Sequence, residues 1–345
     1  MYFMKILVTG GAGFMGSNMI HHLMSRYPEY RIVNVDKLTY AGNLDNLKDL
    51  ENDPRYTFVK ADISDAPAMD RIFAEHHFDA IINYAAETHV DRSILNPSAF
   101  LYTEVIGTYH LLEAVRKHHI AKMIQISTDE VYGSIMNGEF TEESPLNPLN
   151  PYSAAKAGAD HLCAAYAHTY RLPVIMTHSC NYIGEYQHPE KFIPLFITNL
   201  IEDKTVPVYG DGMQMREWIY TEDHCAAIDI LLHRGKVGES YNLGTNHREH
   251  NINVVKMMLA ILGKGEGLIS YVKDRAGHDV RYAVSCEKFM KEYGWKPKYD
   301  LRESLQRTVD WYRGNEWWWK KIKNSDDFQK YYNKQYIQRE EQPVA

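Results

Sequence analysis

Five side chains that could carry acid–base chemistry lie close together in the middle of the chain. They are a hydroxyl, two adjacent carboxylates, a phenol and an ammonium: Thr128, Asp129, Glu130, Tyr152 and Lys156. Tyr152 and Lys156 are four residues apart, a spacing that puts both side chains on one face of a helix. Because a cation beside a phenol favours the phenolate, Tyr152 is predicted to act as a base near neutral pH. Beside a nicotinamide, such a base takes a hydroxyl proton while hydride leaves the same carbon.

The elements around these residues are predicted to bring them to one edge of a sheet. The apolar run 122–127 is typical of a buried parallel strand, and Pro151 begins a helical stretch over residues 154–170. Open α/β sheets build their sites at the carboxyl ends of strands, which is where the hydroxyl and the two carboxylates lie. Neighbouring side chains on a strand point to opposite sides, so the backbone must turn at Asp129 and Glu130 if both are to reach one substrate.

The amino-terminal stretch predicts a dinucleotide site. A short β-rich run ends at Thr9, glycines recur at every third position of the segment GGAGFMG, and a helical pattern follows. Such a loop turns tightly, lets a pyrophosphate approach the backbone, and presents the positive end of a helix. Asp36 ends the next strand, twenty residues after Gly16, where an acid binds a ribose 2′-hydroxyl and disfavours a 2′-phosphate. We therefore predict NAD as the cofactor. The predicted contacts are Gly10, Gly13, Phe14, Met15, Gly16, Asp36, Asp62, Ile63, Ala85, Ala86, Tyr152 and Lys156.

Strands and helices alternate along the chain, which predicts a Rossmann-type, doubly wound parallel sheet with a smaller mixed α/β lobe. The chain has 345 residues, enough for about two domains. We expect an NAD-binding domain over residues 1–178 and a nucleotide-sugar-binding lobe over 179–345. An alternative is that the chain crosses back to the sheet of the first domain at about residues 206–245.

Composition excludes several classes of protein. A net charge of −7 argues against a nucleic-acid surface, and no apolar stretch is long enough to span a bilayer. The four cysteines are scattered without CxxC spacing. We therefore expect neither a metal site nor a disulfide framework, and a reducing cytoplasm fits best.

At this point the motifs resemble a known family. The glycine loop, AAETHVDRS (85–93), STDEVYG (127–133) and PYSAAKAGADHL (151–162) together are similar to the extended short-chain dehydrogenase/reductases. Within these, the chain is most similar to the dTDP-glucose 4,6-dehydratases, from Lys5 to about Trp319. The adjacent Asp129 and Glu130 after Thr128 mark this dehydratase branch, whereas the glycine loop and the YxxxK pair are shared with epimerases.

The resemblance implies a reaction with internal redox balance. Tyr152, assisted by Lys156 and Thr128, removes the proton of the sugar 4-hydroxyl while NAD takes hydride from C4. Glu130 then removes the acidified C5 proton, and Asp129 protonates the departing 6-hydroxyl. Hydride returns to C6, which gives a 4-keto-6-deoxy sugar. One carboxylate must be an acid and its neighbour a base, so their pKa values must differ.

The resemblance also implies how the nucleotide-diphosphate sugar is held. Arg216 and Arg275 are predicted on the diphosphate, because a guanidinium matches phosphate oxygens in a fork. The predicted substrate residues are Thr88, Asn181, Glu190, Lys191, Lys204, Arg216, Arg275 and His278. The family implies a homodimer formed through the helices near 98–118 and 152–170.

Several residues depart from the family pattern. Glu104 and Tyr182 replace asparagines, Glu185 replaces a proline, and His188 replaces a phenylalanine. The first choice of function is an NAD-dependent dTDP-glucose 4,6-dehydratase. These departures keep a UDP-linked hexose (UDP-glucose or UDP-N-acetylglucosamine) open as the substrate, with a 5,6-unsaturated product as one end point. A nucleotide-sugar 4-epimerase, which has no need of the Asp129–Glu130 pair, and a non-catalytic dinucleotide sensor also stay open as functions.

Overall fold

A seven-stranded sheet forms the base of the molecule. The structure is a computed structural model that describes residues 3–274 and 279–337. The strands follow the order β10-β6-β5-β4-β1-β2-β3, and all neighbours are parallel. The sheet strands are β1 (Lys5–Thr9), β2 (Arg31–Asp36), β3 (Tyr56–Lys60), β4 (Ala80–Asn83), β5 (Lys122–Thr128), β6 (Val174–Ser179) and β10 (Ser240–Leu243). The predicted fold class is confirmed.

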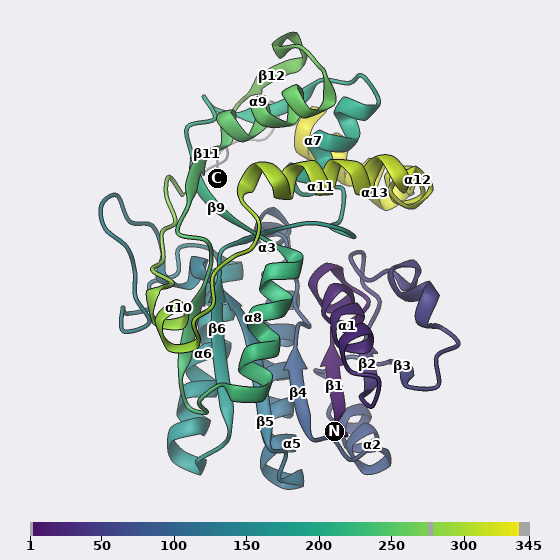
Figure 1. The fold of residues 1–345 in the computed structure, drawn as a ribbon, viewed down its shortest axis with the longest axis vertical. Coiled ribbons are helices and arrows are strands. Elements are labelled where there is room, and N and C mark those ends of the chain that lie inside the picture. The colour runs from purple at the N-terminus through teal and green to yellow at the C-terminus, as the bar shows by residue number, and fades with distance from the viewer. Residues whose placement is uncertain (1–2, 275–278, 338–345) are drawn as a thin grey trace.

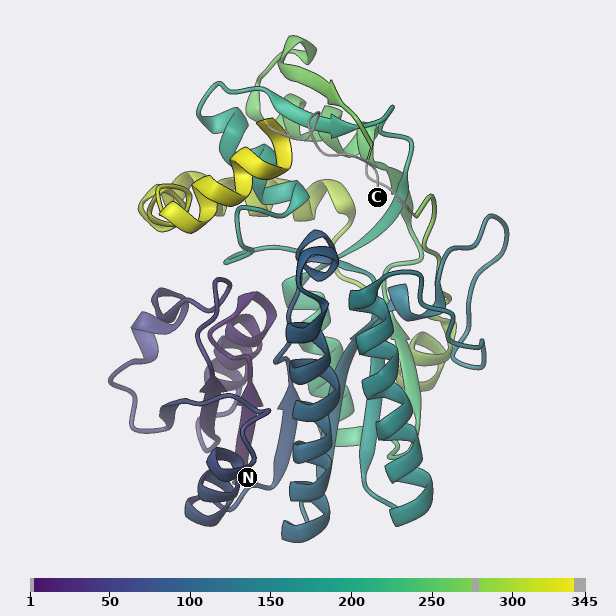
Figure 2. The same cartoon turned by 180° about the vertical axis from the view of Figure 1, so that it is seen from behind.

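Helices cover both faces of this sheet. Figure 1 shows α1 (Phe14–Arg26) and α8 (Thr221–Arg234) on one face. Figure 2 shows α2 (Ala66–Glu75), α5 (Thr108–His118) and α6 (Pro151–Tyr170) on the other. A separate apolar core lies under each set of helices. The strand order reverses between β1 and β4, and such a switch point is where open α/β sheets bind ligands.

A smaller lobe lies over the carboxyl ends of the strands (Figure 1). It has its own core, and its strands pair as β11-β9-β7 and β12-β8. The strands of the lobe are β7 (Asn181–Ile183), β8 (Val206–Tyr209), β9 (Met215–Tyr220), β11 (Arg248–His250) and β12 (Ile269–Val272). Its helices are α7 (Phe192–Ile201), α9 (Asn251–Leu262), α11 (Leu301–Gly314), α12 (Glu316–Lys323) and α13 (Asp326–Tyr332). Because β10 pairs with β6 and α10 (Glu287–Tyr293) packs on β10, the chain after residue 178 contributes to both layers.

The long helix expected from about residue 98 to 118 is not a single α-helix. After α3 (Val90–Leu95), the chain forms α4 (Pro97–Phe100), a π-helical segment η2 (Leu101–Gly107) and then α5. Gly107 allows close packing, since a Cβ there would lie 2.4 Å from Cδ1 of Ile63. A π-helical turn has no recognisable period in the sequence. The apolar pattern therefore predicted one continuous helix.

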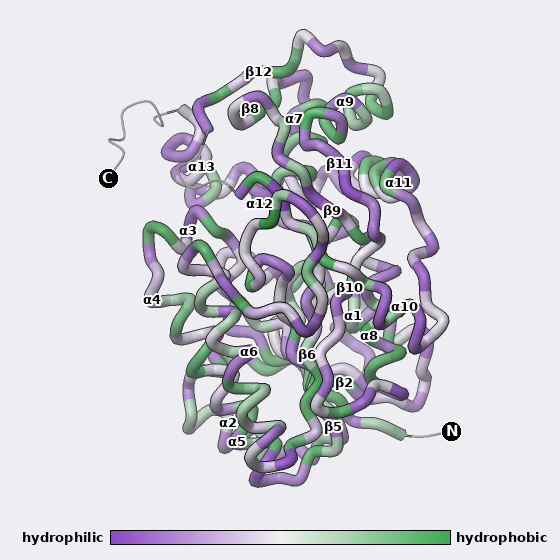
Figure 3. The backbone as a smooth tube through the Cα atoms, turned by 90° about the vertical axis from the view of Figure 1, so that its left-hand side faces the viewer, coloured by the Kyte–Doolittle hydropathy of each residue, from purple (hydrophilic) through white to green (hydrophobic). Residues whose placement is uncertain are grey.

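The carboxyl-terminal helices connect the lobe to the first layer. Figure 3 shows α12 and α13 on the same side of the molecule as α3 and α4. Trp318 is buried in the core of the lobe, and its indole N–H donates to Oδ1 of Asn46 at 2.8 Å. Asn46 in turn donates to the carbonyl of Ala12 in the glycine loop at 3.0 Å. These two hydrogen bonds therefore connect α12 to the glycine loop. No helix in the described part of the chain is long and apolar enough to cross a membrane.

Candidate active site

The two carboxylates lie in a turn at the end of β5. Thr128 is the last residue of that strand, and a 3₁₀ turn, η3 (Asp129–Tyr132), follows at once. The Thr128 hydroxyl accepts from the backbone N–H of Glu130 at 3.3 Å and donates to Oδ1 of Asp129 at 3.2 Å. Gly133 ends the turn with φ +84°, in the region that favours glycine. The turn needed to present both carboxylates to one cleft is therefore present.

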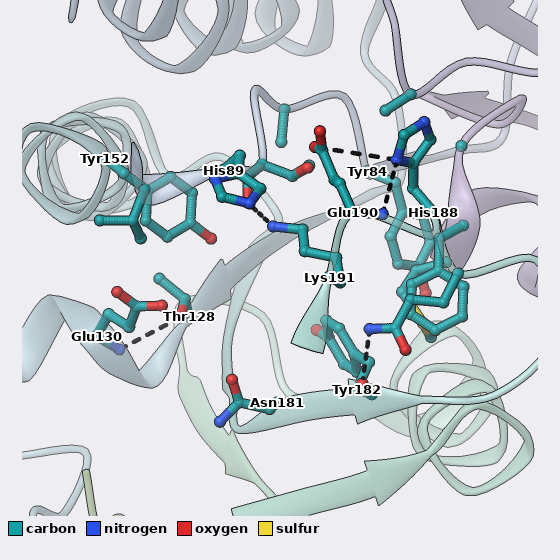
Figure 4. A pocket seen from close by; sticks show the side chains of 18 of the residues that line it. Tyr84, His89, Thr128, Glu130, Tyr152, Asn181, Tyr182, His188, Glu190 and Lys191 are labelled. Atoms are coloured by element: carbon teal, nitrogen blue, oxygen red, sulfur yellow. Dashed lines mark hydrogen bonds and ion pairs between the residues drawn. The ribbon is translucent and has the colours of Figure 1, made fainter. Parts of the chain in front are cut away.

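The phenol and the ammonium come from the first turns of α6. Asn150 and Ser153 form a capping box, and Pro151 occupies the first helical position, so this helix begins at a fixed point. Tyr152 and Lys156 both line the cleft that Thr128 and Glu130 face. Figure 4 shows the Tyr152 ring beside Thr128, with Glu130 on the same side. The structure thus brings together all five residues predicted from the sequence as an acid–base set.

The buried position of Asp129 changes its chemistry. Asp129 is 4% exposed, and burial raises the pKa of its carboxyl to about 8, with further increases from the charges of Glu130 and Glu217 and a decrease from Arg216. Asp129 therefore holds a proton near neutral pH and can donate it. Such a state suits a general acid, which needs a pKa close to the working pH.

The loop after β1 fits the backbone approach that a dinucleotide needs. Gly10 has φ +65°, and a Cβ on it would lie 2.6 Å from the backbone N of Ala85. A Cβ on Gly16 would lie 2.3 Å from the carbonyl oxygen of Gly10. Asp36 is held by backbone N–H groups of Ala12 (3.0 Å) and Leu38 (2.8 Å), which fixes its carboxylate at the end of β2.

Most of the predicted cofactor contacts line one cleft. These residues are Gly10, Gly13, Phe14, Met15, Gly16, Asp36, Ile63, Ala85 and Ala86, with Tyr152 and Lys156 at the far end. Asp62 is the exception. It accepts from the N–H and the hydroxyl of Ser64 at 2.8 Å and lies 3.7 Å from the Lys37 ammonium, outside the lining.

The predicted substrate residues fall into three groups. Thr88, Asn181, Glu190, Lys191 and Arg216 line the same cleft. Lys204 does not: its side chain is 63% exposed, and it pairs with Glu202 at 3.0 Å in the turn between α7 and β8. The structure therefore places Lys204 outside the lining of the cleft. The other two predicted residues, Arg275 and His278, lie outside the described residues.

The lining residues of the lobe are held by hydrogen bonds and ion pairs. Lys191 donates to the carbonyl of Thr88, and Glu190 pairs with Arg92 at 3.0 Å. Arg216 donates to three backbone carbonyls, the shortest contact being 2.7 Å to Asp279. These contacts connect the lobe to the loop after β4 and hold its polar groups against the cleft.

The structure adds tyrosines to the cleft that are not among the predicted cofactor and substrate residues. Tyr84, Tyr209, Tyr282 and Tyr336 all line the cleft. The Tyr282 hydroxyl lies 3.4 Å from Oε2 of Glu130, and the Arg216 guanidinium lies 4.4 Å from the centre of the Tyr282 ring. Tyr336 stacks on Tyr209, with ring centres 6.0 Å apart. No spacing in the sequence connects these aromatic residues, because tertiary packing alone brings them together. Over residues 3–274 and 279–337 no group of three or more acidic, histidine or cysteine side chains is arranged for a metal.

The chain matches known proteins over most of its length. A family model described as GDP-mannose 4,6 dehydratase matches residues 7–308. A dTDP-glucose 4,6-dehydratase of Neisseria meningitidis serogroup B is 45% identical over 342 residues, covering 93% of this chain and 96% of the relative. A crystal structure of dTDP-glucose 4,6-dehydratase from Bacillus anthracis in complex with NAD is 48% identical, with a TM-score of 0.87, and covers 92% of this chain and 99% of that one.

An epimerase with the same fold is more distant. UDP-glucose 4-epimerase of Thermotoga maritima, solved with UDP-glucose, is 29% identical with a TM-score of 0.84, and covers 91% of this chain and 100% of that one. The difference in identity agrees with the motif assignment, in which the adjacent carboxylates separate the two branches. The chain therefore belongs to the family that the GDP-mannose 4,6 dehydratase model describes and is a relative of the dTDP-glucose 4,6-dehydratases.

Proposed function

We propose that this chain dehydrates a nucleotide-diphosphohexose, with dTDP-glucose as the substrate and dTDP-4-keto-6-deoxyglucose as the product. C4 is oxidised, water is lost between C5 and C6, and C6 is reduced, so the reaction consumes no external oxidant. NAD, when bound against Gly10, Gly16 and Asp36, supplies the acceptor and donor of hydride. The likeness to relatives named for this activity supports the proposal.

One observation carries the proposal beyond the likeness. Asp129 and Glu130 are neighbours in one turn and both line the cleft with Tyr152, and Asp129 is buried with a pKa of about 8. A dehydration needs an acid for the leaving hydroxyl and a base for the adjacent carbon, close to each other.

The residues then have separate tasks. Tyr152, with Thr128 and Lys156 beside it, removes the proton of the sugar 4-hydroxyl. The resulting C4 ketone makes the C5 proton acidic, and Glu130 removes it. Asp129 donates its proton to the departing 6-hydroxyl, so water leaves. Glu130 then holds the proton that returns to C5.

The test is mass spectrometry of the purified protein with dTDP-glucose in deuterated water, without added reductant. Loss of water together with one deuterium retained at C5 is the expected result. Loss of water with a 5,6-unsaturated product would show that C6 is not reduced. No mass change with dTDP-glucose, UDP-glucose or UDP-N-acetylglucosamine would contradict the proposed activity and favour a non-catalytic dinucleotide sensor.

A UDP-linked hexose is a second candidate substrate. Tyr182 and His188 line the cleft at positions where the resemblance implies an asparagine and a phenylalanine. Tyr182 packs edge-on against Phe14 of the glycine loop, with ring centres 6.4 Å apart, so it changes the wall of the site itself. The same assay with UDP-glucose and UDP-N-acetylglucosamine decides between the substrates by their relative turnover.

We further propose that the chain forms a homodimer through η2, α5 and α6. Tyr102, Ile106 and Tyr109 recur at helical spacing on this side, and they are 63%, 39% and 41% exposed. Exposed apolar side chains grouped in this way are typical of an interface. The change Ile106→Glu is expected to convert a dimer to a monomer in sedimentation experiments, with Val237→Glu on a distant exposed loop as the control. A wild-type protein that sediments as a monomer would contradict this assembly.

The proposed place of action is a reducing cytoplasm. Its support is that Cys163, Cys180, Cys225 and Cys286 are all buried with free thiols. Buried thiols kept reduced are typical of proteins in such a compartment.

A further inference from the structure

Glu104 forms a buried ion pair with the lysine of the active site. Its side chain is 0% exposed, and its Oε2 lies 2.8 Å from Nζ of Lys156. The other carboxylate oxygen accepts a hydrogen bond of 3.1 Å from the backbone N–H of Glu87. Lys156 also donates to the carbonyl of Ile126 at 3.2 Å. A buried charge is tolerated only with such partners. Burial raises the pKa of the Glu104 carboxyl, whereas the Lys156 ammonium and the Glu87 N–H lower it.

The π-helical segment η2 places this carboxylate. Glu104 stands in the middle of η2, where the wider helical turn changes the direction of side chains relative to an α-helix. Small residues allow η2 to pack closely against its neighbours. A Cβ on Gly158 of α6 would lie 3.2 Å from Cγ2 of Val105, the residue after Glu104. The close contact of η2 with α6 brings the carboxylate to the first turns of α6, where Tyr152 and Lys156 lie.

The carboxylate reduces the effect of Lys156 on Tyr152. A lone ammonium beside a phenol stabilises the phenolate, whereas an ammonium paired with a carboxylate at 2.8 Å carries almost no net charge. Burial raises the pKa of Tyr152 well above its usual value, and the charges of Glu130 and Glu104 raise it further. A glutamine at position 104 would preserve the shape of the site and remove one of these charges.

Other titratable groups also face this part of the cleft. They lie on η3, on β7, in the loop after β4, at the start of α3 and before α7, with one more on α6 and one on β6. These groups are Glu87, His89, Asp91, Asp129, Glu130, Tyr182 and Lys191, and Asp160 on α6 with His178 on β6. Among the carboxylates of the described residues, Glu104 is the one that forms an ion pair with the Lys156 ammonium.

We propose that Glu104 is a positioning residue that fixes the Lys156 ammonium and thereby sets the pH at which Tyr152 becomes a base. This inference rests on the proposed function only in assigning Tyr152 as the base. The inference predicts that turnover occurs at higher pH than it would in an enzyme whose Lys156 ammonium had no carboxylate paired with it.

The test measures the ionisation of Tyr152 without substrate. The absorbance of tyrosinate is followed against pH for the NAD-loaded wild type and for Glu104→Gln, each compared with the same protein carrying Tyr152→Phe. The difference between the two absorbance titrations is the signal of Tyr152 alone. We expect Glu104→Gln to lower its midpoint by about one pH unit or more. The pH at which turnover is half-maximal on the acid side should fall by a similar amount.

The control is Glu113→Gln on α5, which removes the same charge from a carboxylate that pairs with Arg116 at 2.6 Å, away from the cleft. It should leave both midpoints unchanged. If Glu104→Gln does not remain folded by thermal melting, Glu104→Asn serves in its place. An unchanged or raised Tyr152 midpoint would overturn the inference, even if the enzyme turns over its substrate. A lowered midpoint without turnover of any sugar would leave the inference standing and contradict the proposed function instead.

Discussion

A buried carboxyl group with a raised pKa makes the stability of the protein depend on pH. In the unfolded chain, Asp129 ionises near pH 4, whereas in the folded protein it ionises at about 8. Below about pH 4 this carboxyl is protonated in both states and does not affect the free energy of unfolding. As the pH rises from about 4 to 8, its burial lowers the free energy of unfolding by an increasing amount. At higher pH the folded state must hold this carboxylate with little contact with water.

The change Asp129→Asn removes that penalty. We expect the variant to gain stability relative to the wild type as the pH rises, by a few kcal/mol more at pH 9 than at pH 5. Urea unfolding at the two pH values measures the difference. The exposed carboxylate of Asp310 on α11 provides a control, and Asp310→Asn should show no such trend. An effect of Asp129→Asn that does not change with pH would contradict the raised pKa.

Glu130 is expected to act after oxidation of the sugar. Glu130→Gln should lower turnover by about 10²-fold or more, because the amide cannot remove the C5 proton. Oxidation at C4 would still occur, so the absorbance of reduced cofactor should build up on mixing with substrate in a stopped-flow experiment. Tyr152→Phe, in contrast, should give neither product nor reduced cofactor. Full turnover by Glu130→Gln would favour an epimerase.

At the scale of elements, the glycine loop and the sheet are predictable from the sequence because each leaves a local signal. Gly10 and Gly16 stand where a side chain would meet backbone atoms at 2.6 and 2.3 Å, so no other residue fits. The central strands are buried on both faces and appear as continuous apolar runs. The contact between Glu104 and Lys156 is not predictable, because it depends on a π-helical turn. The position of Lys204 outside the cleft lining is not predictable either, because a resemblance of segments does not fix the direction of an exposed side chain.

A side chain at Gly16 should disrupt the cofactor loop. In Gly16→Ala the new Cβ would lie 2.3 Å from the Gly10 carbonyl, so the loop and α1 must move apart. We expect at least a tenfold loss of NAD affinity, about 1.4 kcal/mol, and a lower melting temperature. NAD titration and thermal melting measure the two effects. Gly314→Ala at the end of α11 is the matched control, because its Cβ would meet nothing within 4 Å.

At the scale of the whole molecule, specific hydrogen bonds join the sheet layer to the lobe. Trp318 and Asn46 form one of them, through a hydrogen bond of 2.8 Å, and Asn46 continues to Ala12 in the glycine loop. The sequence held no signal for this contact, because its two partners are more than two hundred residues apart in the chain.

Trp318→Phe tests this connection. The change leaves Oδ1 of Asn46 without its donor and creates a small cavity, so we expect a loss of about 2 to 4 kcal/mol in unfolding free energy. NAD affinity should fall as well, since Asn46 supports the loop. Trp317→Phe is the matched control, because the Trp317 side chain, next to Trp318 in the sequence, is 55% exposed. Equal effects of the two changes would contradict a specific role for the Trp318 contact.

The same contact orders the events of synthesis on the ribosome. The glycine loop is synthesised some three hundred residues before Trp318. The edge of β6 likewise remains open until β10 has been made. A growing chain can therefore form most of its sheet while the cofactor loop still lacks its support. NAD should therefore stabilise a chain that includes Trp318 more than a nascent fragment that ends before it.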